Sequence, residues 1–139
     1  MAVGDVATRS AVVDRTGAWR DDPVWFVQDV FKATPDAWQV DVLRAFPMNQ
    51  RLAMKACKGP GKSTVLSWLV WNFIATRPRA KVVATSITAD TLADTLWAEF
   101  AKWYERSPFL KRQFTWGKTQ ITNNESPGDS FVTARSWPK

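Results

Sequence analysis

The stretch from Ala56 to Thr64, which reads Ala-Cys-Lys-Gly-Pro-Gly-Lys-Ser-Thr, constrains the fold of this chain more than any other feature. It has the pattern of a phosphate-binding loop of the Walker A kind, except that Ala56 stands where the first glycine is usual. In such a loop, small residues let backbone N–H groups surround a phosphate, the lysine reaches the β- and γ-phosphates, and the following hydroxyl binds Mg²⁺. The pattern therefore predicts a nucleoside triphosphate site, with Lys62 at the phosphates and Ser63 as the Mg²⁺ ligand. The residues predicted to line it are Cys57, Lys58, Gly59, Pro60, Gly61, Lys62, Ser63 and Thr64.

A loop of this kind needs a strand before it and a helix after it. Residues 51–56 alternate apolar and polar side chains, which is typical of a half-buried strand, although their β-propensity is modest. Residues 65–75 are apolar on nearly every side, which favours a helix buried against a sheet. The alternative is a Gly-Pro-Gly turn followed by a lysine without function.

The composition excludes several kinds of catalytic site. The chain has 139 residues, enough for one domain with its own core. It has no histidine, so His-based metal sites and Ser-His or Cys-His nucleophilic pairs are excluded. Its single cysteine, Cys57, rules out an internal disulfide and is compatible with a reducing compartment.

The net charge and the hydropathy pattern indicate which kinds of partner the chain could bind. The net charge of +6 fits a polyanionic partner such as nucleic acid, and it equally fits ordinary solvated lysines and arginines. The N-terminus lacks the apolar core of a signal peptide, and the apolar run 65–75 is too short to span a bilayer. The sequence therefore predicts a soluble protein without a membrane partner.

Helix and strand signals alternate along the chain. Residues 1–22 predict a flexible arm, and Asp22-Pro23 predicts the start of a helix. Further helices are predicted from Thr34-Pro35-Asp36 to about Phe46, after the loop to about Thr76, and after a Thr88 cap. The predicted strands lie at residues 81–86, 114–116, 119–122 and 130–135. This alternation predicts an α/β fold whose partly parallel sheet is flanked by helices, after an N-terminal helical segment.

Hydrolysis of a triphosphate requires more than a phosphate loop. It requires an acidic residue that holds Mg²⁺ and a group that orients water, usually at the end of a second buried strand. Downstream of the loop, no run of four apolar residues ends in Asp or Glu. The sequence therefore predicts a chain that binds a nucleotide but does not complete its hydrolysis.

Several motifs together resemble the ATPase part of the large terminase subunit of tailed bacteriophages, the motor that pumps DNA into a preformed capsid. The resemblance covers about residue 23 to the C-terminus, and the order of the motifs carries more weight than any one of them. Besides the loop, the motifs are Trp38-Gln39, Ala84-Thr85-Ser86, Leu96-Trp97-Ala98-Glu99 and Phe131-Val132-Thr133-Ala134-Arg135-Ser136.

The resemblance implies an incomplete P-loop NTPase domain of the RecA-like (ASCE) type over residues 23–139, without the acidic Walker B strand and without a nuclease domain. It implies ATP and Mg²⁺ as cofactors. Gln39 would hydrogen-bond the adenine, with Trp38 packed nearby. Lys58 would touch the γ-phosphate and act together with Lys62 in catalysis.

The implied partners are double-stranded DNA, the portal protein and the small terminase subunit, in a homo-oligomeric motor docked at the procapsid portal in the cytoplasm of the infected bacterium. The chain stops about where the acidic strand would be expected, so we expect an N-terminal fragment that is marginally stable or self-associates alone. Alternative functions are a non-catalytic nucleotide- or DNA-binding regulatory module, a helicase-like ATPase fragment and, less favoured, a kinase.

Overall fold

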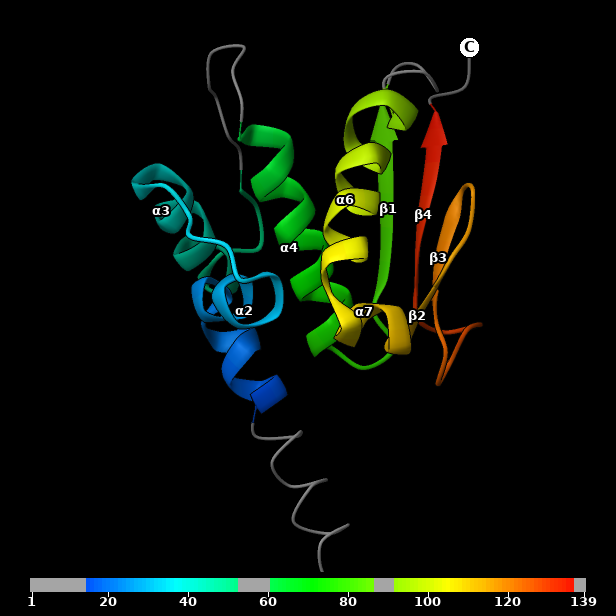
Figure 1. Cartoon of the computed structure of the whole chain (residues 1–139), viewed down its shortest axis with the longest axis horizontal. Coiled ribbons are helices and arrows are strands. Elements are labelled where there is room, and N and C mark those ends of the chain that lie inside the picture. Colours follow the sequence, from blue (N-terminus) through cyan, green and yellow to red (C-terminus); the bar gives the residue numbers. More distant parts are fainter. Residues whose placement is uncertain (1–14, 53–60, 87–91, 137–139) are drawn as a thin grey trace, which may run out of the picture.

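The computed structural model describes residues 15–52, 61–86 and 92–136. These residues form an α/β structure with a four-stranded mixed sheet (Figure 1). The strand order is β1-β4-β3-β2. The strands are β1 (Lys81–Ser86), β2 (Phe114–Trp116), β3 (Gln120–Asn123) and β4 (Phe131–Ser136).

Proline and capping residues set several helix starts. Asp22 caps α2, where its carboxylate accepts a hydrogen bond from Trp25 N at 3.4 Å, and Ser107 caps α7 in the same way. A helix over residues 15–21 precedes α2. The other elements are α2 (Pro23–Phe31), α3 (Ala37–Ala45), the 3₁₀ turn η1 (Phe46–Met48), α4 (Lys62–Thr76), the π-helical segment η2 (Leu92–Trp97), α6 (Ala98–Arg106) and α7 (Pro108–Gln113).

The sheet confirms the predicted mixture of parallel and antiparallel strands. β1 runs parallel to β4, with Lys81 opposite Phe131, whereas β3 is antiparallel to both β4 and β2. The hairpin between β2 and β3 turns at Gly117, where an added Cβ would lie 2.5 Å from the carbonyl oxygen of Gln120. Only glycine fits that turn, which joins the two strands predicted at residues 114–116 and 119–122.

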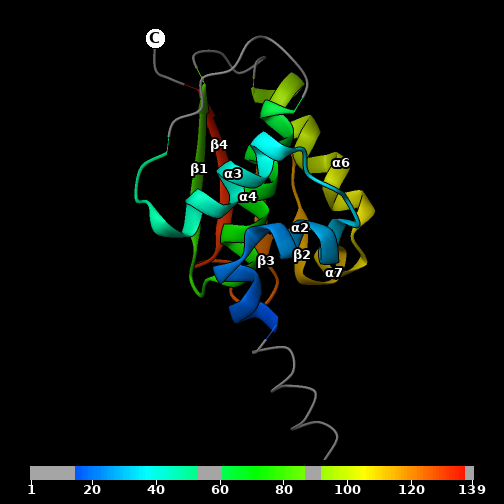
Figure 2. The same ribbon diagram turned by 90° about the vertical axis from the view of Figure 1, so that its left-hand side faces the viewer.

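The helices lie in layers on one side of the sheet in the described part of the chain. Figures 1 and 2 show α4 and α6 next to the sheet, with α2 and α3 on the outer side of α4. Along β1, Val82 and Ala84 pack toward the core, while Lys81, Val83 and Thr85 are exposed. This alternation is the expected pattern for a strand covered on one face.

Aromatic side chains join α4 to α6 and to the sheet. Trp71 of α4 is fully buried and its ring packs against Phe100, Tyr104 and Phe114, with centroids 5.6–6.3 Å apart. In the helix predicted after Thr88, three aromatic side chains face the core and are buried: Trp97, Phe100 and Trp103. The Thr88 cap itself lies outside the described residues.

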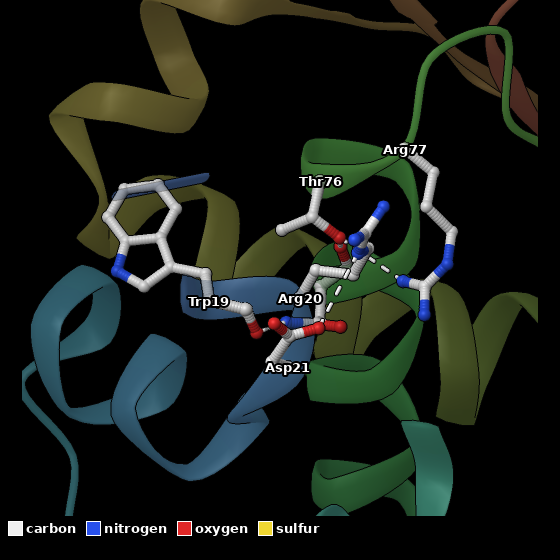
Figure 3. A network of polar contacts seen from close by, with 6 residues as sticks. Trp19, Arg20, Asp21, Thr76 and Arg77 are labelled. Atoms are coloured by element: carbon white, nitrogen blue, oxygen red, sulfur yellow. Dashed lines mark hydrogen bonds and ion pairs between the residues drawn. The ribbon is translucent and has the colours of Figure 1, made fainter. Parts of the chain in front are cut away.

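The prediction of a flexible arm over residues 1–22 is wrong for residues 15–22. Trp19 is only 6% exposed, and its indole Nε1 donates to Asp29 at 3.1 Å. Its carbonyl accepts a hydrogen bond of 2.8 Å from the buried Asn72 side chain, and the backbone carbonyl of Asn72 accepts one from the Thr76 hydroxyl. Figure 3 shows where Trp19 and Thr76 lie in this network. This segment therefore belongs to the folded body, because the Trp19 ring packs against α2 and α7 and its carbonyl is hydrogen-bonded to α4.

Two other predictions concern boundaries. Of the strand predicted at residues 51–56, Arg51 and Leu52 are in no strand, and the remaining positions lie outside the described residues. The helix predicted from Thr34 begins at Ala37. None of the described helices is long and apolar enough to cross a membrane.

Candidate functional site

The described part of the predicted phosphate loop lies at the start of α4. Gly61 is the N-cap residue, and Lys62 is the first residue of this 15-residue helix. In Figure 1, α4 begins at the same end of the sheet at which the parallel strands β1 and β4 end. In open α/β sheets, ligands bind beyond the carboxyl ends of the parallel strands.

The start of α4 presents backbone donors. Val65 N donates to the carbonyl of Gly61 at 3.0 Å, which closes the first turn of the helix. The helix geometry leaves the N–H groups of Lys62, Ser63 and Thr64 without a partner inside the helix. These groups and the positive end of the helix dipole together favour an anion at this position.

Gly61 occupies a position that only glycine can fill. Its φ is +112°, in the region that side chains disfavour. A Cβ at this position would lie 2.9 Å from Gln39 Nε2 and 3.0 Å from Trp38 Cζ2. The glycine of the motif is therefore required both by the backbone conformation and by the close approach of α3.

Gln39 connects the start of α3 to the start of α4. It is 5% exposed; its Nε2 donates to the carbonyl of Gly61 at 3.1 Å, and its Oε1 accepts from Asp36 N at 2.8 Å. A primary amide has a second N–H and a further lone pair. The structure thus places Trp38 and Gln39 next to Gly61. The adenine contact of Gln39, with Trp38 nearby, stays a prediction.

Glu99 is a site residue to which sequence reasoning assigned no role. Its Oε2 accepts a hydrogen bond from Thr64 Oγ1 at 3.2 Å and another from Trp103 Nε1 at 3.1 Å. The spacing of Glu99 and Trp103 on a helix indicates their contact, because residues four apart are neighbours. The contact with Thr64 joins residues 35 positions apart, and no local pattern in the sequence signals it.

The predicted ligands are only partly described. Cys57, Lys58, Gly59 and Pro60 lie outside the described residues, and Lys62, Ser63 and Thr64 are half-buried. Within the described ranges no cluster of three or more His, Cys, Asp or Glu residues exists. The donor chemistry still fits Mg²⁺, because this ion is commonly held by one or two protein oxygens together with phosphates and water.

Two hollows are lined by described residues other than Gly61, Lys62, Ser63 and Thr64. One, of about 390 Å³, is lined mainly by apolar side chains of η1, α4 and β1, among them Phe46, Leu69 and Val82. The other, of about 650 Å³, lies at the far end of α4 and is lined in part by Arg20 and Arg77. Burial, and to a lesser degree the charge of Arg20, lowers the pKa of Arg77.

Comparisons with known proteins do not assign the chain to a family. No protein-family model matches the sequence, and no curated protein matches it. The class that the structure shows is an α/β protein with a four-stranded mixed sheet and flanking helices.

Proposed function

We propose that this chain binds ATP with Mg²⁺ through residues 56–64, as the ATP-binding part of a viral DNA-packaging motor of the terminase kind. One observation carries the proposal. The Gly61-Lys62-Ser63-Thr64 end of the motif starts α4 at the carboxyl ends of two parallel strands, with Gly61 in a conformation that glycine alone tolerates. An incomplete P-loop NTPase fold over residues 23–139 is part of the same proposal.

Each residue has a role that follows from its chemistry. The N–H groups of Lys62, Ser63 and Thr64 bind phosphate oxygens, and the Lys62 ammonium neutralises charge on the β- and γ-phosphates. Lys58 approaches the γ-phosphate, and Gln39 contacts the adenine beside Trp38. Mg²⁺, when bound, neutralises phosphate charge, and Ser63 supplies its protein hydroxyl ligand.

We expect binding without efficient hydrolysis by this chain. Turnover requires one carboxylate that holds the metal and a second group that orients the attacking water. Glu99, the carboxylate that contacts the loop in the described structure, is hydrogen-bonded to Thr64 and Trp103. This observation favours a second candidate function, a nucleotide-binding module that regulates a partner without turnover.

The wider setting follows from the resemblance alone. We propose double-stranded DNA, the portal protein and the small terminase subunit as partners of a homo-oligomeric motor at the procapsid portal in the infected cell. The net charge of +6 supports an anionic partner such as DNA.

Calorimetry with ATP and Mg²⁺ tests the nucleotide site. Replacing Lys62 with Ala removes a charge-assisted contact to phosphate, so we expect affinity to fall by about 10- to 100-fold. Lys111→Ala is the matched control, because Lys111 is a partly exposed lysine of α7 that pairs with Glu105. Equal affinities of wild type and Lys62→Ala would refute the phosphate-loop assignment.

Two further measurements separate the candidate functions. Steady-state hydrolysis of ATP by the same preparation distinguishes a turning-over ATPase from a binding module. Duplex DNA binding that weakens steeply with added salt would support the motor, because phosphate contacts release counterions.

A further inference from the structure

Glu99 places a negative charge beside the predicted phosphate site. Its Oε2 lies 3.2 Å from Thr64 Oγ1, and Thr64 belongs to the first turn of α4. Without a ligand this placement is favourable, since a carboxylate near a helix N-terminus interacts well with the helix dipole. The carboxylate therefore already interacts with the positive helix N-terminus to which a phosphate would bind.

A phosphate held by the N–H groups of Lys62, Ser63 and Thr64 would lie at the same helix turn whose Thr64 hydroxyl contacts Glu99. Like charges held a few ångströms apart in a half-buried site repel each other strongly, and salt screens them poorly. A divalent cation between the two groups reverses the sign of the interaction. Ser63, next to Thr64 in the chain, supplies a hydroxyl on the same turn, and Mg²⁺ readily takes a carboxylate directly or through water.

We propose that Glu99 makes phosphate binding at the start of α4 depend on a divalent cation. This inference rests on the proposed nucleotide site and deepens it by assigning a specificity-determining carboxylate on α6. Glu99 discriminates the magnesium complex of a nucleotide from the free nucleotide, because only the complex compensates its charge.

The indole N–H of Trp103 can be used to monitor Glu99 by NMR. The indole N–H donates to the same Oε2 that Thr64 contacts, and the ring is 4% exposed between Trp68 and Phe31, with centroids 5.3 Å away in both cases. A cation that is coordinated by the Glu99 carboxylate weakens this hydrogen bond. The indole resonance of Trp103 therefore moves when Mg²⁺ enters.

The experiment measures ATP affinity by calorimetry with Mg²⁺ and with EDTA, for wild type, Glu99→Gln and Glu105→Gln. Glutamine keeps one acceptor oxygen for Thr64 and Trp103, removes the charge and replaces the other carboxylate oxygen with an NH2 group. Glu105→Gln removes the same charge from an exposed position on α6, where Glu105 pairs with Lys111. In EDTA we expect Glu99→Gln to bind ATP about tenfold more tightly than wild type. The ratio of the ATP affinity with Mg²⁺ to the affinity in EDTA then falls sharply for this variant. For Glu105→Gln we expect the wild-type ratio.

The outcomes separate the two proposals. Suppose that wild type binds ATP, and that Glu99→Gln has the same ratio of ATP affinities with Mg²⁺ and in EDTA or loses affinity equally in both conditions. Glu99 then only stabilises the structure, and the inference is wrong. If wild type binds ATP in neither condition, the proposed nucleotide site fails and the inference fails with it.

A second measurement covers a variant that does not fold. In ¹H–¹⁵N spectra of the wild type, assigned with Trp103→Phe, we add Mg²⁺ to the ATP-saturated protein. We expect the Trp103 indole resonance to move more than that of Trp97, another buried indole on the same helical stretch. A Trp103 resonance that stays fixed while Mg²⁺ binds would overturn the inference.

Discussion

Replacing Gly61 with alanine tests the geometry on which the candidate site depends. Gly61 has φ +112°, and its carbonyl accepts the hydrogen bond from the buried Gln39 side chain. The substitution adds one methyl group and changes no charge. Its effect therefore reports the backbone conformation and the packing at the start of α4.

The magnitude follows from two terms. Holding a non-glycine residue in a disfavoured backbone region costs about 1–3 kcal/mol. The added Cβ would lie 2.9 Å from Gln39 Nε2 and 3.0 Å from Trp38 Cζ2, and overpacking of this kind costs about 1–3 kcal/mol. Gln39 cannot move away freely, since Asp36 N also holds it. We expect the free energy of unfolding to fall by about 2–6 kcal/mol, the sum of the two terms, and Tm by roughly 5–20 °C.

Urea unfolding followed by circular dichroism measures this change. Gly17→Ala is the matched control, because Gly17 lies in the helix over residues 15–21 and an added Cβ meets nothing within 4 Å. That substitution should stabilise the protein by about 0.5–1 kcal/mol. In the Gly61→Ala background, Trp38→Ala should recover part of the packing term but not the backbone term. A Gly61→Ala protein as stable as wild type would refute the described start of α4.

Three further predictions follow from other contacts. Asn72→Ala should lower the free energy of unfolding by about 1–3 kcal/mol in urea titrations, because the buried carbonyl of Trp19 loses its donor. Gln39→Ala should cost about 1–3 kcal/mol in the same assay and weaken ATP binding by calorimetry, because it removes the hydrogen bond to the Gly61 carbonyl and leaves that acceptor without its donor. Val83→Lys should change stability by less than about 0.5 kcal/mol, since Val83 is 56% exposed, and should reduce any self-association seen by light scattering, because β1 is an edge of the described sheet.

The elements that the sequence predicts well are those with a local cause. The strand at residues 81–86 has the predicted bounds, and α4 ends at Thr76 as expected ahead of Pro78. The hairpin at Gly117 follows from a turn that only glycine fits. In each case propensity, periodicity and turn residues within a few positions agree with the tertiary structure.

The features that the sequence does not predict depend on distant partners. Trp19 stands among polar and charged residues, and its burial depends on Asp29 and Asn72, which are 10 and 53 positions away. The π-helical start of the helix at residues 92–97 has no local signal of its own. Glu99 reads as a surface charge until α6 lies beside α4 and brings it to Thr64. Local patterns cannot encode these contacts.

The start of α4 is held from two sides by side chains that are distant in sequence. Gln39 of α3 binds the Gly61 carbonyl, and Glu99 of α6 binds the Thr64 hydroxyl. Binding sites act best when supporting hydrogen bonds fix the groups that contact the ligand. A Gly-Pro-Gly turn without function would gain little from such support, whereas a phosphate site needs its donors held before the ligand arrives. In the proposed nucleotide site, a ligand that moved the first turn of α4 would also strain the hydrogen bonds that join this turn to α3 and α6.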